Sequence, residues 1–200
     1  MAENRKLSEK QSHGIDCVSR CRWLNLNNPL YVQYHDTEWG VPVHDDKLLF
    51  ELLILESFQA GLSWECVLNK RQDFRQAYDD FDWNKVACYT GEKEKELLQN
   101  VKLIRHQAKI RASIQNAIAF RQIRQEFLTF DRYIWQFTDG RIIREPYHCA
   151  TVSPLSEKVS KDLKQRKMSF VGPTIIQSYL QAVGVINAHG EECMLCGTER

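Results

Sequence analysis

The amino-acid sequence predicts an all-α fold, and three features of its pattern favour that class. Apolar residues recur at helical spacing in several segments, whereas β-branched residues are scattered and few runs alternate between apolar and polar positions. Residues that open or cap helices, such as Asp, Ser and Pro, stand where several of these segments begin. From Cys21 onward the chain contains no low-complexity linker and no internal repeat. We therefore expect several helices of medium length joined by short loops.

The first predicted helix carries an apolar run that ends at Phe58. Asp45 and Asp46 stand before this run and can cap the helix. Apolar residues cover nearly all of its sides, so we expect the helix to lie at the centre of the core. A second helix is predicted over 92–98, where Glu and Lys residues open the segment.

Two further helical patterns follow. The segment 102–121 predicts a long amphipathic helix. The residues expected on its apolar side are Ile104, Ala108, Ala112 and Ile118. The segment 127–137 is rich in aromatic residues and is also predicted to be helical.

The last two predicted helices form a pair. One spans 156–167 and begins with a Ser residue. Pro173 suits the first turn of the other, which runs over 174–183 and is closed by Gly184.

Composition and charge exclude several classes of protein. The 27 Lys and Arg residues nearly balance the 26 Asp and Glu residues, which excludes a uniformly basic surface but not a local basic face. No apolar run approaches the roughly 18 residues that a membrane-spanning helix needs. Residues 1–16 are polar and lack the apolar segment of an export signal, so we expect a flexible tail, a single domain over 17–200 and a cytoplasmic location.

The seven cysteines are unevenly placed along the chain. Disulfide bonds are not expected in the reducing cytoplasm. The isolated Cys66, Cys88 and Cys149 are therefore expected to be small core residues. The other four lie in two clusters, one near each end of the chain. That layout raises the question of a metal site.

Spacing alone supports two sets of zinc ligands. His189 and Cys193 stand four positions apart and would complete a closed Cys2His2 set with Cys21 and His35. The rival set combines four cysteines, namely Cys17, Cys21, Cys193 and Cys196. Either set would hold a structural ion that ties the two ends of the domain together, and a third reading is reduced thiols without metal.

A carboxylate in an apolar run marks a candidate pocket. Glu56 shares its helical face with Leu49, Leu52 and Leu53, so it must be paired or functional. Amphipathic rings lie in the neighbouring segments, namely Trp23, Tyr31, Tyr34, Trp39 and Trp64. Such rings together with one buried carboxylate suit a flat, cationic or hydrogen-bond-donating ring. The alternatives are ordinary core aromatics and a buried ion pair or backbone cap for the carboxylate.

Basic residues gather in two places. Helical spacing relates Lys102, Arg105 and Lys109, and a solvated helix face is the default for such a group. The second group runs into the segment 169–174 and consists of Lys158, Lys161, Lys164, Arg166 and Lys167. A Gly-containing turn followed by a helix N-terminus can hold one DNA phosphate through backbone N–H groups.

Several motifs resemble the bacterial DNA-3-methyladenine glycosylase I family. They occur in order over nearly the whole chain, from Cys21 to Cys193. The most specific are Y-V-Q-Y-H-D-T-E-W-G-V-P at 31–42 and Q-A-G-L-S-W at 59–64. The others are Cys21-Arg22-Trp23, Ile104-Arg105-His106 and the segment 170–189. One departure is Ser57, where family members often carry Gly beside the carboxylate.

The resemblance implies an α-helical helix-hairpin-helix glycosylase fold with two helical lobes and the pocket between them. It also implies a structural zinc ion held by Cys21, His35, His189 and Cys193, in preference to the set that uses Cys17 and Cys196. The pocket would be lined by Glu56, Tyr34 and Trp64, with Trp23 and Tyr31 nearby. DNA would be contacted by a loop with Gly61 and the wedge residue Leu62, and by a hairpin with Val171, Gly172 and Thr174.

The activity implied is hydrolysis of the N-glycosidic bond of 3-methyladenine in double-stranded alkylated DNA. The position where related glycosylases carry a catalytic Asp matches Asn187, so we expect Glu56 to bind the base rather than activate water. No Lys stands at 172–174, which predicts a monofunctional enzyme that leaves an intact abasic site. We expect a monomer. The alternatives are a non-catalytic module that binds alkylated DNA and a zinc hydrolase for a small molecule.

Overall fold

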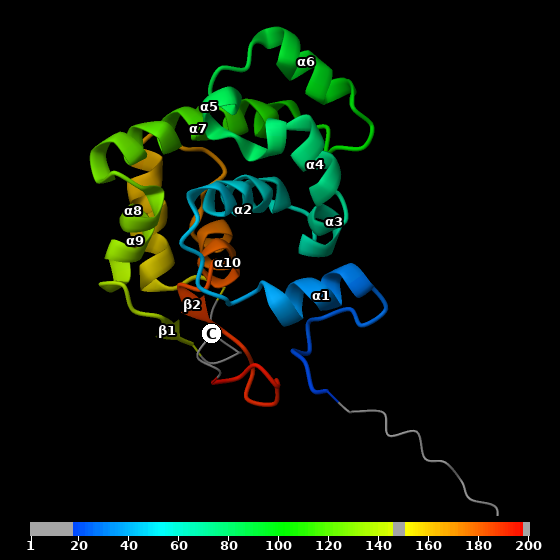
Figure 1. Ribbon diagram of the computed structural model, residues 1–200, viewed down its shortest axis with the longest axis vertical. Coiled ribbons are helices and arrows are strands. Elements are labelled where there is room, and N and C mark those ends of the chain that lie inside the picture. The colour runs from blue at the N-terminus through cyan, green and yellow to red at the C-terminus, as the bar shows by residue number, and fades with distance from the viewer. Residues whose placement is uncertain (1–17, 146–150, 198–200) are drawn as a thin grey trace, which may run out of the picture.

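The computed structural model describes residues 18–145 and 151–197 of the chain (Figure 1). The tail predicted over 1–16, and the predictions for Cys17 and Cys149, concern residues outside these ranges. Over the described residues the chain is mostly helical, in agreement with the predicted class. No helix among them is both long and apolar enough to cross a membrane.

The elements follow one another with short connections. Their bounds are α1 Pro29–Thr37, α2 Asp46–Gln59, α3 Trp64–Leu68, α4 Arg71–Ala77, η1 Asp79–Phe81, α5 Trp83–Val86, α6 Gly91–Gln99, α7 Gln107–Phe127, α8 Phe130–Trp135, η2 Gln136–Thr138, β1 Ile143–Arg144, α9 Pro154–Gln165, α10 Pro173–Ala182 and β2 Ile186–Asn187. The strands β1 and β2 form one short parallel ladder that pairs Ile143 with Ile186. A two-residue strand is too short to show alternation, so the sequence pattern did not reveal it.

The central helix is α2, as predicted. The Asp45 side chain caps it by accepting a hydrogen bond from the Leu48 amide at 2.8 Å. Every residue from Leu49 to Phe58 is buried. The helix packs against α3, α7, α8 and α10, and it lies in the middle of the view in Figure 1.

The long helix α7 begins later than the predicted 102–121. The His106 ring accepts a hydrogen bond from the Lys109 amide at 3.3 Å, so it caps a helix that begins at Gln107 and continues to Phe127. The expected apolar side is confirmed at Ala112, which is buried, and is wrong at Ile104, which precedes the helix, and at Ala108, which is exposed. The buried face instead carries Ile110, Ser113, Ala117 and Phe120. Alanine gives a weak signal because it fits either side of a helix.

The other boundaries were closer. The predicted helix over 127–137 divides, because Leu128 has a positive φ of 72° and Thr129 caps α8. Helix α9 begins at Pro154, two residues before the expected start, because Ser153 rather than Ser156 is the cap. Helix α10 is confirmed.

The end of α10 touches an early part of the chain. Gly184 has a φ of +73°, and a Cβ there would lie 2.4 Å from the Val41 carbonyl carbon. Any side chain at this position would force the two backbones apart. This contact brings the segment after α1 against the end of α10. A second contact joins the two ends of the described chain, since the Met194 amide donates a hydrogen bond to the Ser19 carbonyl at 2.8 Å (Figure 1).

Two of the isolated cysteines do not lie in the core. Cys66 is half-buried and Cys88 is exposed. The buried side of α3 is taken by Trp64, Val67 and Leu68, and Cys88 lies in the turn after α5, where its amide donates to Lys85 O. The expectation that both are core residues is therefore wrong.

Candidate functional site

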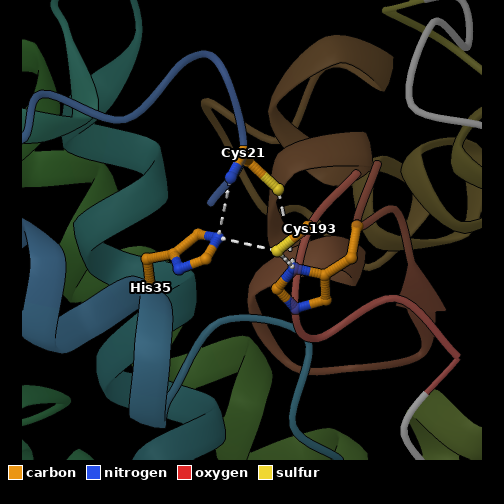
Figure 2. Close-up of side chains that lie close together, drawn as sticks. Cys21, His35 and Cys193 are labelled. Carbon is orange, nitrogen blue, oxygen red and sulfur yellow. Dashed lines mark hydrogen bonds between the residues drawn. The ribbon is translucent and has the colours of Figure 1, made fainter. Parts of the chain in front are cut away.

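Four side chains meet where the two ends of the domain come together. The ligand atoms of Cys21, His35, His189 and Cys193 lie within 4.8 Å of one another, and all four residues are buried. Cys193 Sγ lies 3.6 Å from His35 Nε2 and 3.5 Å from His189 Nδ1, while Cys21 Sγ lies 3.6 Å from His189 Nδ1. Figure 2 shows Cys21, His35 and Cys193 converging on one point. This metal-ligand cluster could hold a metal ion.

The outer nitrogen atoms of both imidazoles are engaged. His35 Nδ1 lies 2.8 Å from Asp36 Oδ1, and the Arg20 guanidinium holds that carboxylate and lowers its pKa. His189 Nε2 lies 3.2 Å from the Trp39 carbonyl oxygen. A hydrogen bond from one ring nitrogen to such an acceptor leaves the other nitrogen unprotonated. His35 Nε2 and His189 Nδ1 therefore face the sulfur atoms as available ligands.

Without a cation, burial favours the protonated form of the Cys21 thiol. Burial raises the pKa of the Cys21 thiol to about 12, and the neighbouring Cys193 adds to the shift. A cation bound among the sulfur atoms would reverse this preference and favour the thiolates. The rival set receives less support, because Cys196 is exposed and Cys17 lies outside the described residues.

A small cavity opens beside the cluster. It has a volume of about 170 Å³ and collects side chains from α1, α2, α3 and α10. The residues that line it are Trp23, Tyr31, Tyr34, Trp39, Glu56, Gln59, Trp64, Ser178 and Gln181. All five residues predicted to bind a flat ring are therefore brought together in one aromatic cavity.

The rings of the aromatic cavity surround its single carboxylate. The Tyr34 and Trp64 rings lie 5.3 Å apart at 46°, and the Trp23 and Tyr31 rings lie 5.3 Å apart at 44°. Trp39 joins the cavity to the metal-ligand cluster, since its ring lies 4.6 Å from that of His189. Tilted rings at these distances make a stable wall for a planar ligand.

Glu56 is the unusual residue of the cavity. It is 2% exposed, and among the described residues no basic side chain forms an ion pair with it. Its Oε2 atom has no hydrogen-bond partner, and burial raises the pKa of the carboxyl well above its usual value. The reading of Glu56 as a member of a buried ion pair is therefore wrong.

Two further polar atoms in the cavity lack a partner. They are the Gln59 side-chain oxygen and the Trp64 indole nitrogen. Together with Glu56 Oε2 they offer two acceptors and one donor inside a space of aromatic rings. Burying polar groups of this kind costs free energy when they make no hydrogen bond, and a ligand in the cavity could supply the partners.

The sequence reasoning missed Gln59, Ser178 and Gln181 as cavity residues. Gln59 lies within the motif at 59–64 and one helical turn after Glu56, which could have identified it. Ser178 and Gln181 come from α10, and only the packing of α10 against α2 brings them here. No pattern in the sequence predicts the packing of α10 against α2.

Two turns lie close to the cavity-forming helices. In the α2–α3 turn, residues 60–63, Gly61 has a φ of +79° and Leu62 is 41% exposed. The α9–α10 turn, residues 166–172, precedes the N-terminus of α10. Thr174 is exposed there, whereas Val171 is fully buried and its carbonyl accepts a hydrogen bond from the Ser160 hydroxyl, so the expected contact of Val171 with DNA does not fit this structure.

The basic groups differ from the predicted faces. Lys109 is 6% exposed and takes no part in a solvated surface, which corrects its assignment to a basic face. Arg166 is paired with Asp162 and Glu126 and packs over the Phe127 ring. The exposed cations near the α9–α10 turn are Lys158, Lys161, Lys164 and Lys167.

Comparisons with known proteins identify the family to which this helical chain belongs. The family model for methyladenine glycosylase matches residues 23–196. DNA-3-methyladenine glycosylase 1 of Escherichia coli is 41% identical over 182 residues, which cover 88% of this chain and 96% of that protein. The chain belongs to the methyladenine glycosylase family.

Solved structures give the same result. A crystal structure of 3-methyladenine DNA glycosylase I aligns with a TM-score of 0.86 at 41% identity, over 90% of this chain and 100% of the other. The 3-methyladenine DNA glycosylase I of Staphylococcus aureus, from work on the structural basis of 3-methyladenine recognition, aligns with a TM-score of 0.83 at 34% identity. The alignment covers 86% of this chain and 94% of the Staphylococcus aureus chain.

Proposed function

We propose that the protein is a DNA glycosylase that hydrolyses the N-glycosidic bond of 3-methyladenine in alkylated double-stranded DNA. The observation that carries this proposal is the unpartnered carboxylate of Glu56 inside the aromatic cavity. Membership of the methyladenine glycosylase family supports the same substrate. The product is DNA with an intact abasic site.

The chemistry requires little from the protein. Methylation at N3 makes the base cationic, so the bond to the sugar is already weakened. Water attacks C1′ while the C1′–N9 bond breaks, the electron pair of that bond neutralises the departing ring, and the proton of the water passes to solvent. The protein must mainly extract the base from the duplex and hold it in the reactive position.

Recognition rests on charge and stacking. A cationic ring lying on Tyr34 and Trp64 gains roughly 0.5–2 kcal/mol per contact over a neutral one. The same positive charge favours the ionised form of Glu56, whose carboxylate accepts hydrogen bonds from the amino edge of the base. Gln59 and Trp64 supply the remaining acceptor and donor. Neutral adenine lacks the charge and gains less from each of these contacts.

DNA is held at two places in this proposal. Leu62 enters the space that the extruded base leaves in the stack, since it is an exposed apolar residue next to a Gly with a positive φ. The backbone at Gly172 and Thr174, where the α9–α10 turn leads into α10, receives a phosphate as a helix-hairpin-helix element. The exposed Lys residues of α9 extend this contact along the duplex.

The metal-ligand cluster fits a structural zinc ion. Zinc bonds of about 2.3 Å to sulfur and 2.0–2.1 Å to nitrogen at tetrahedral angles separate the two atoms by about 3.6 Å. The sulfur–nitrogen distances of 3.5–3.6 Å in the cluster match this edge. Bound there, zinc would supply folding stability, and four protein ligands leave no place for a reactive water.

The zinc assignment is tested with two cysteine variants. Cys193→Ser removes a ligand, whereas Cys196→Ser is the matched control on an exposed neighbour. We expect the first variant to lose zinc and to lower Tm by more than about 4 °C, since about 2 kcal/mol corresponds to roughly 4–8 °C for a chain of this size. The control should keep both zinc and Tm. Full zinc content in Cys193→Ser would contradict the assignment.

The activity is tested by chromatography of the bases that the purified protein releases from methylated duplex DNA. We expect 3-methyladenine with little 7-methylguanine, and no strand breaks without alkali or heat. Breaks made by the pure protein would contradict the monofunctional mechanism. No released base from a folded protein that binds methylated DNA would identify a binding module instead.

A further inference from the structure

A buried lysine lies between the two turns that the proposed function assigns to DNA. Lys109 stands in the first turn of α7 and is 6% exposed. Its Nζ atom donates hydrogen bonds to the Phe58 carbonyl at 2.8 Å and to the Ala60 carbonyl at 2.6 Å. No carboxylate among the described residues forms an ion pair with it. Burial lowers the pKa of the ammonium, so its placement is unfavourable unless these contacts compensate.

The two carbonyls belong to the end of α2. That helix has no basic residue in its own last turn, where carbonyl groups point outward and carry partial negative charge. Lys109 supplies the missing cation from another helix. Gly61, with its positive φ, follows at once, and the Leu62 amide donates back to Gln59 O. The ammonium therefore holds the backbone from which Leu62 projects.

The same part of α7 also touches the α9–α10 turn. The Lys109 Nζ atom lies 6.0 Å from the centre of the Phe170 ring, and the His106 ring lies 6.2 Å from it at 80°. Asn116, further along α7, donates to the Ser169 carbonyl and accepts from the Ser169 amide. Residues of α7 thus contact both turns, although the turns are far apart in the sequence.

We propose that Lys109 is a positioning residue that fixes the α2–α3 turn, with Leu62, relative to the α9–α10 turn. This inference rests on the proposed function and deepens it, because the step that Lys109 serves is extraction of the base from the duplex. Lys109 is not among the residues that line the aromatic cavity. Lys109 acts only through the two backbone carbonyls and the Phe170 ring.

The matched control is Arg124 on the same helix. Its Nε atom donates a hydrogen bond to Asp46 Oδ2 at 2.5 Å. Arg124 therefore binds the beginning of α2, whereas Lys109 binds its end. Lys109→Met and Arg124→Met each remove one cation that joins α7 to α2. Only the first touches the turns assigned to DNA.

The first measurement is amide hydrogen exchange of the free proteins. In Lys109→Met we expect faster exchange at Leu62 and in the α9–α10 turn together, with the rest of α2 unchanged. Arg124→Met should leave both turns as they are. Unchanged exchange at Leu62 in Lys109→Met would overturn the proposal, and this readout decides even if the protein releases no base.

The second measurement separates base extraction from base binding. For Lys109→Met we expect excision from methylated duplex DNA to fall about 10- to 100-fold, the effect of a lost hydrogen bond to a charged group. Excision from methylated single-stranded DNA, and binding of free 3-methyladenine measured by tryptophan fluorescence, should change less than about twofold. Equal losses on both DNA forms would overturn the positioning role. A wild-type protein without activity would instead reject the proposed function.

If Lys109→Met does not fold, a milder variant tests the same proposal. Lys109→Arg keeps the charge and the donors but shifts them away from the two carbonyls. We expect a smaller loss that is again confined to duplex DNA. An Arg variant with equal losses on duplex and single-stranded DNA would overturn the proposal.

Discussion

Two buried carboxylates on α2 stand in opposite situations. Glu51 is 4% exposed and receives hydrogen bonds from Arg71 at 2.5 Å and from Arg75 at 2.9 Å. Glu56 is 2% exposed, faces the aromatic cavity and leaves Oε2 without a partner. The pKa of Glu56 is raised by burial. One helix thus carries a satisfied acid toward α4 and an unsatisfied acid toward the cavity.

The difference separates an acid that is paired within the fold from an acid that is unpaired in the cavity. An ion pair compensates the desolvation of Glu51, so its removal should affect stability first. No ion pair among the described residues compensates Glu56, which supports the proposal that this carboxyl binds the base. Substituting each residue in turn therefore gives two probes on the same helix, Glu51 for stability and Glu56 for binding.

The largest expected effect is on stability, at Glu51. Glu51→Gln leaves the buried Arg71 with Glu38 as its one charged partner among the described residues, so we expect a loss of about 3 kcal/mol in the free energy of unfolding. Urea unfolding measures it. Binding of free 3-methyladenine should change little as long as the variant is folded.

Glu38→Gln is the control for this prediction. Glu38 holds the same Arg71 at 2.6 Å, but its side chain is 37% exposed, so we expect a loss below about 1 kcal/mol. Equal losses in the two variants would show that burial of the acid does not decide the cost.

The next effect is on binding, at Glu56. Glu56→Gln keeps the shape of the side chain but removes the negative charge, so we expect binding and excision of 3-methyladenine to weaken about 10- to 100-fold. The free energy of unfolding at neutral pH should stay equal or rise by about 1 kcal/mol, because a neutral amide is cheaper to bury. Fluorescence titration and urea unfolding measure the two quantities. Unfolding of this variant would break the comparison by making Glu56 structural.

The smallest effect is the pH dependence of stability. Because the pKa of folded Glu56 lies above its unfolded value of about 4.3, the folded state holds a proton that the unfolded state has released. The stabilisation is full below the unfolded value and is lost as pH rises through the folded value. Urea midpoints at several pH values should therefore bring Glu56→Gln progressively above the wild type as pH rises. A difference that does not change with pH would contradict the raised pKa.

Local patterns predicted the fold where the helix ends are set locally. The Asp45 cap of α2 and the Pro173 start of α10 are both confirmed. The start of α7 was missed although its cap is also local, because His106 is not among the residue types usually found at an N-cap. Its buried face was predicted only in part, because alanine fits either side of a helix. Short helices such as α3 and α5 carry too few turns to show a period.

The candidate site divides in the same way. Burial of Glu56 and the meeting of its aromatic neighbours follow from one apolar run and two motifs, and both are confirmed as placements. The cavity residues from α10 and the inward turn of Lys109 depend on contacts between distant segments. A charge pattern alone assigns Lys109 to the surface, since only the tertiary structure shows the carbonyls that it serves.

The four residues of the metal-ligand cluster are shared evenly between the ends of the chain. Cys21 and His35 come from the N-terminal end, and His189 and Cys193 come from the C-terminal end. A break in the backbone anywhere between 36 and 188 therefore leaves two ligands on each fragment. Two ligands bind zinc far more weakly than four, so under the zinc proposal complementary fragments of this domain would bind the ion tightly only on reassembly. The cluster would then report complementation by metal uptake, independently of any enzymatic turnover.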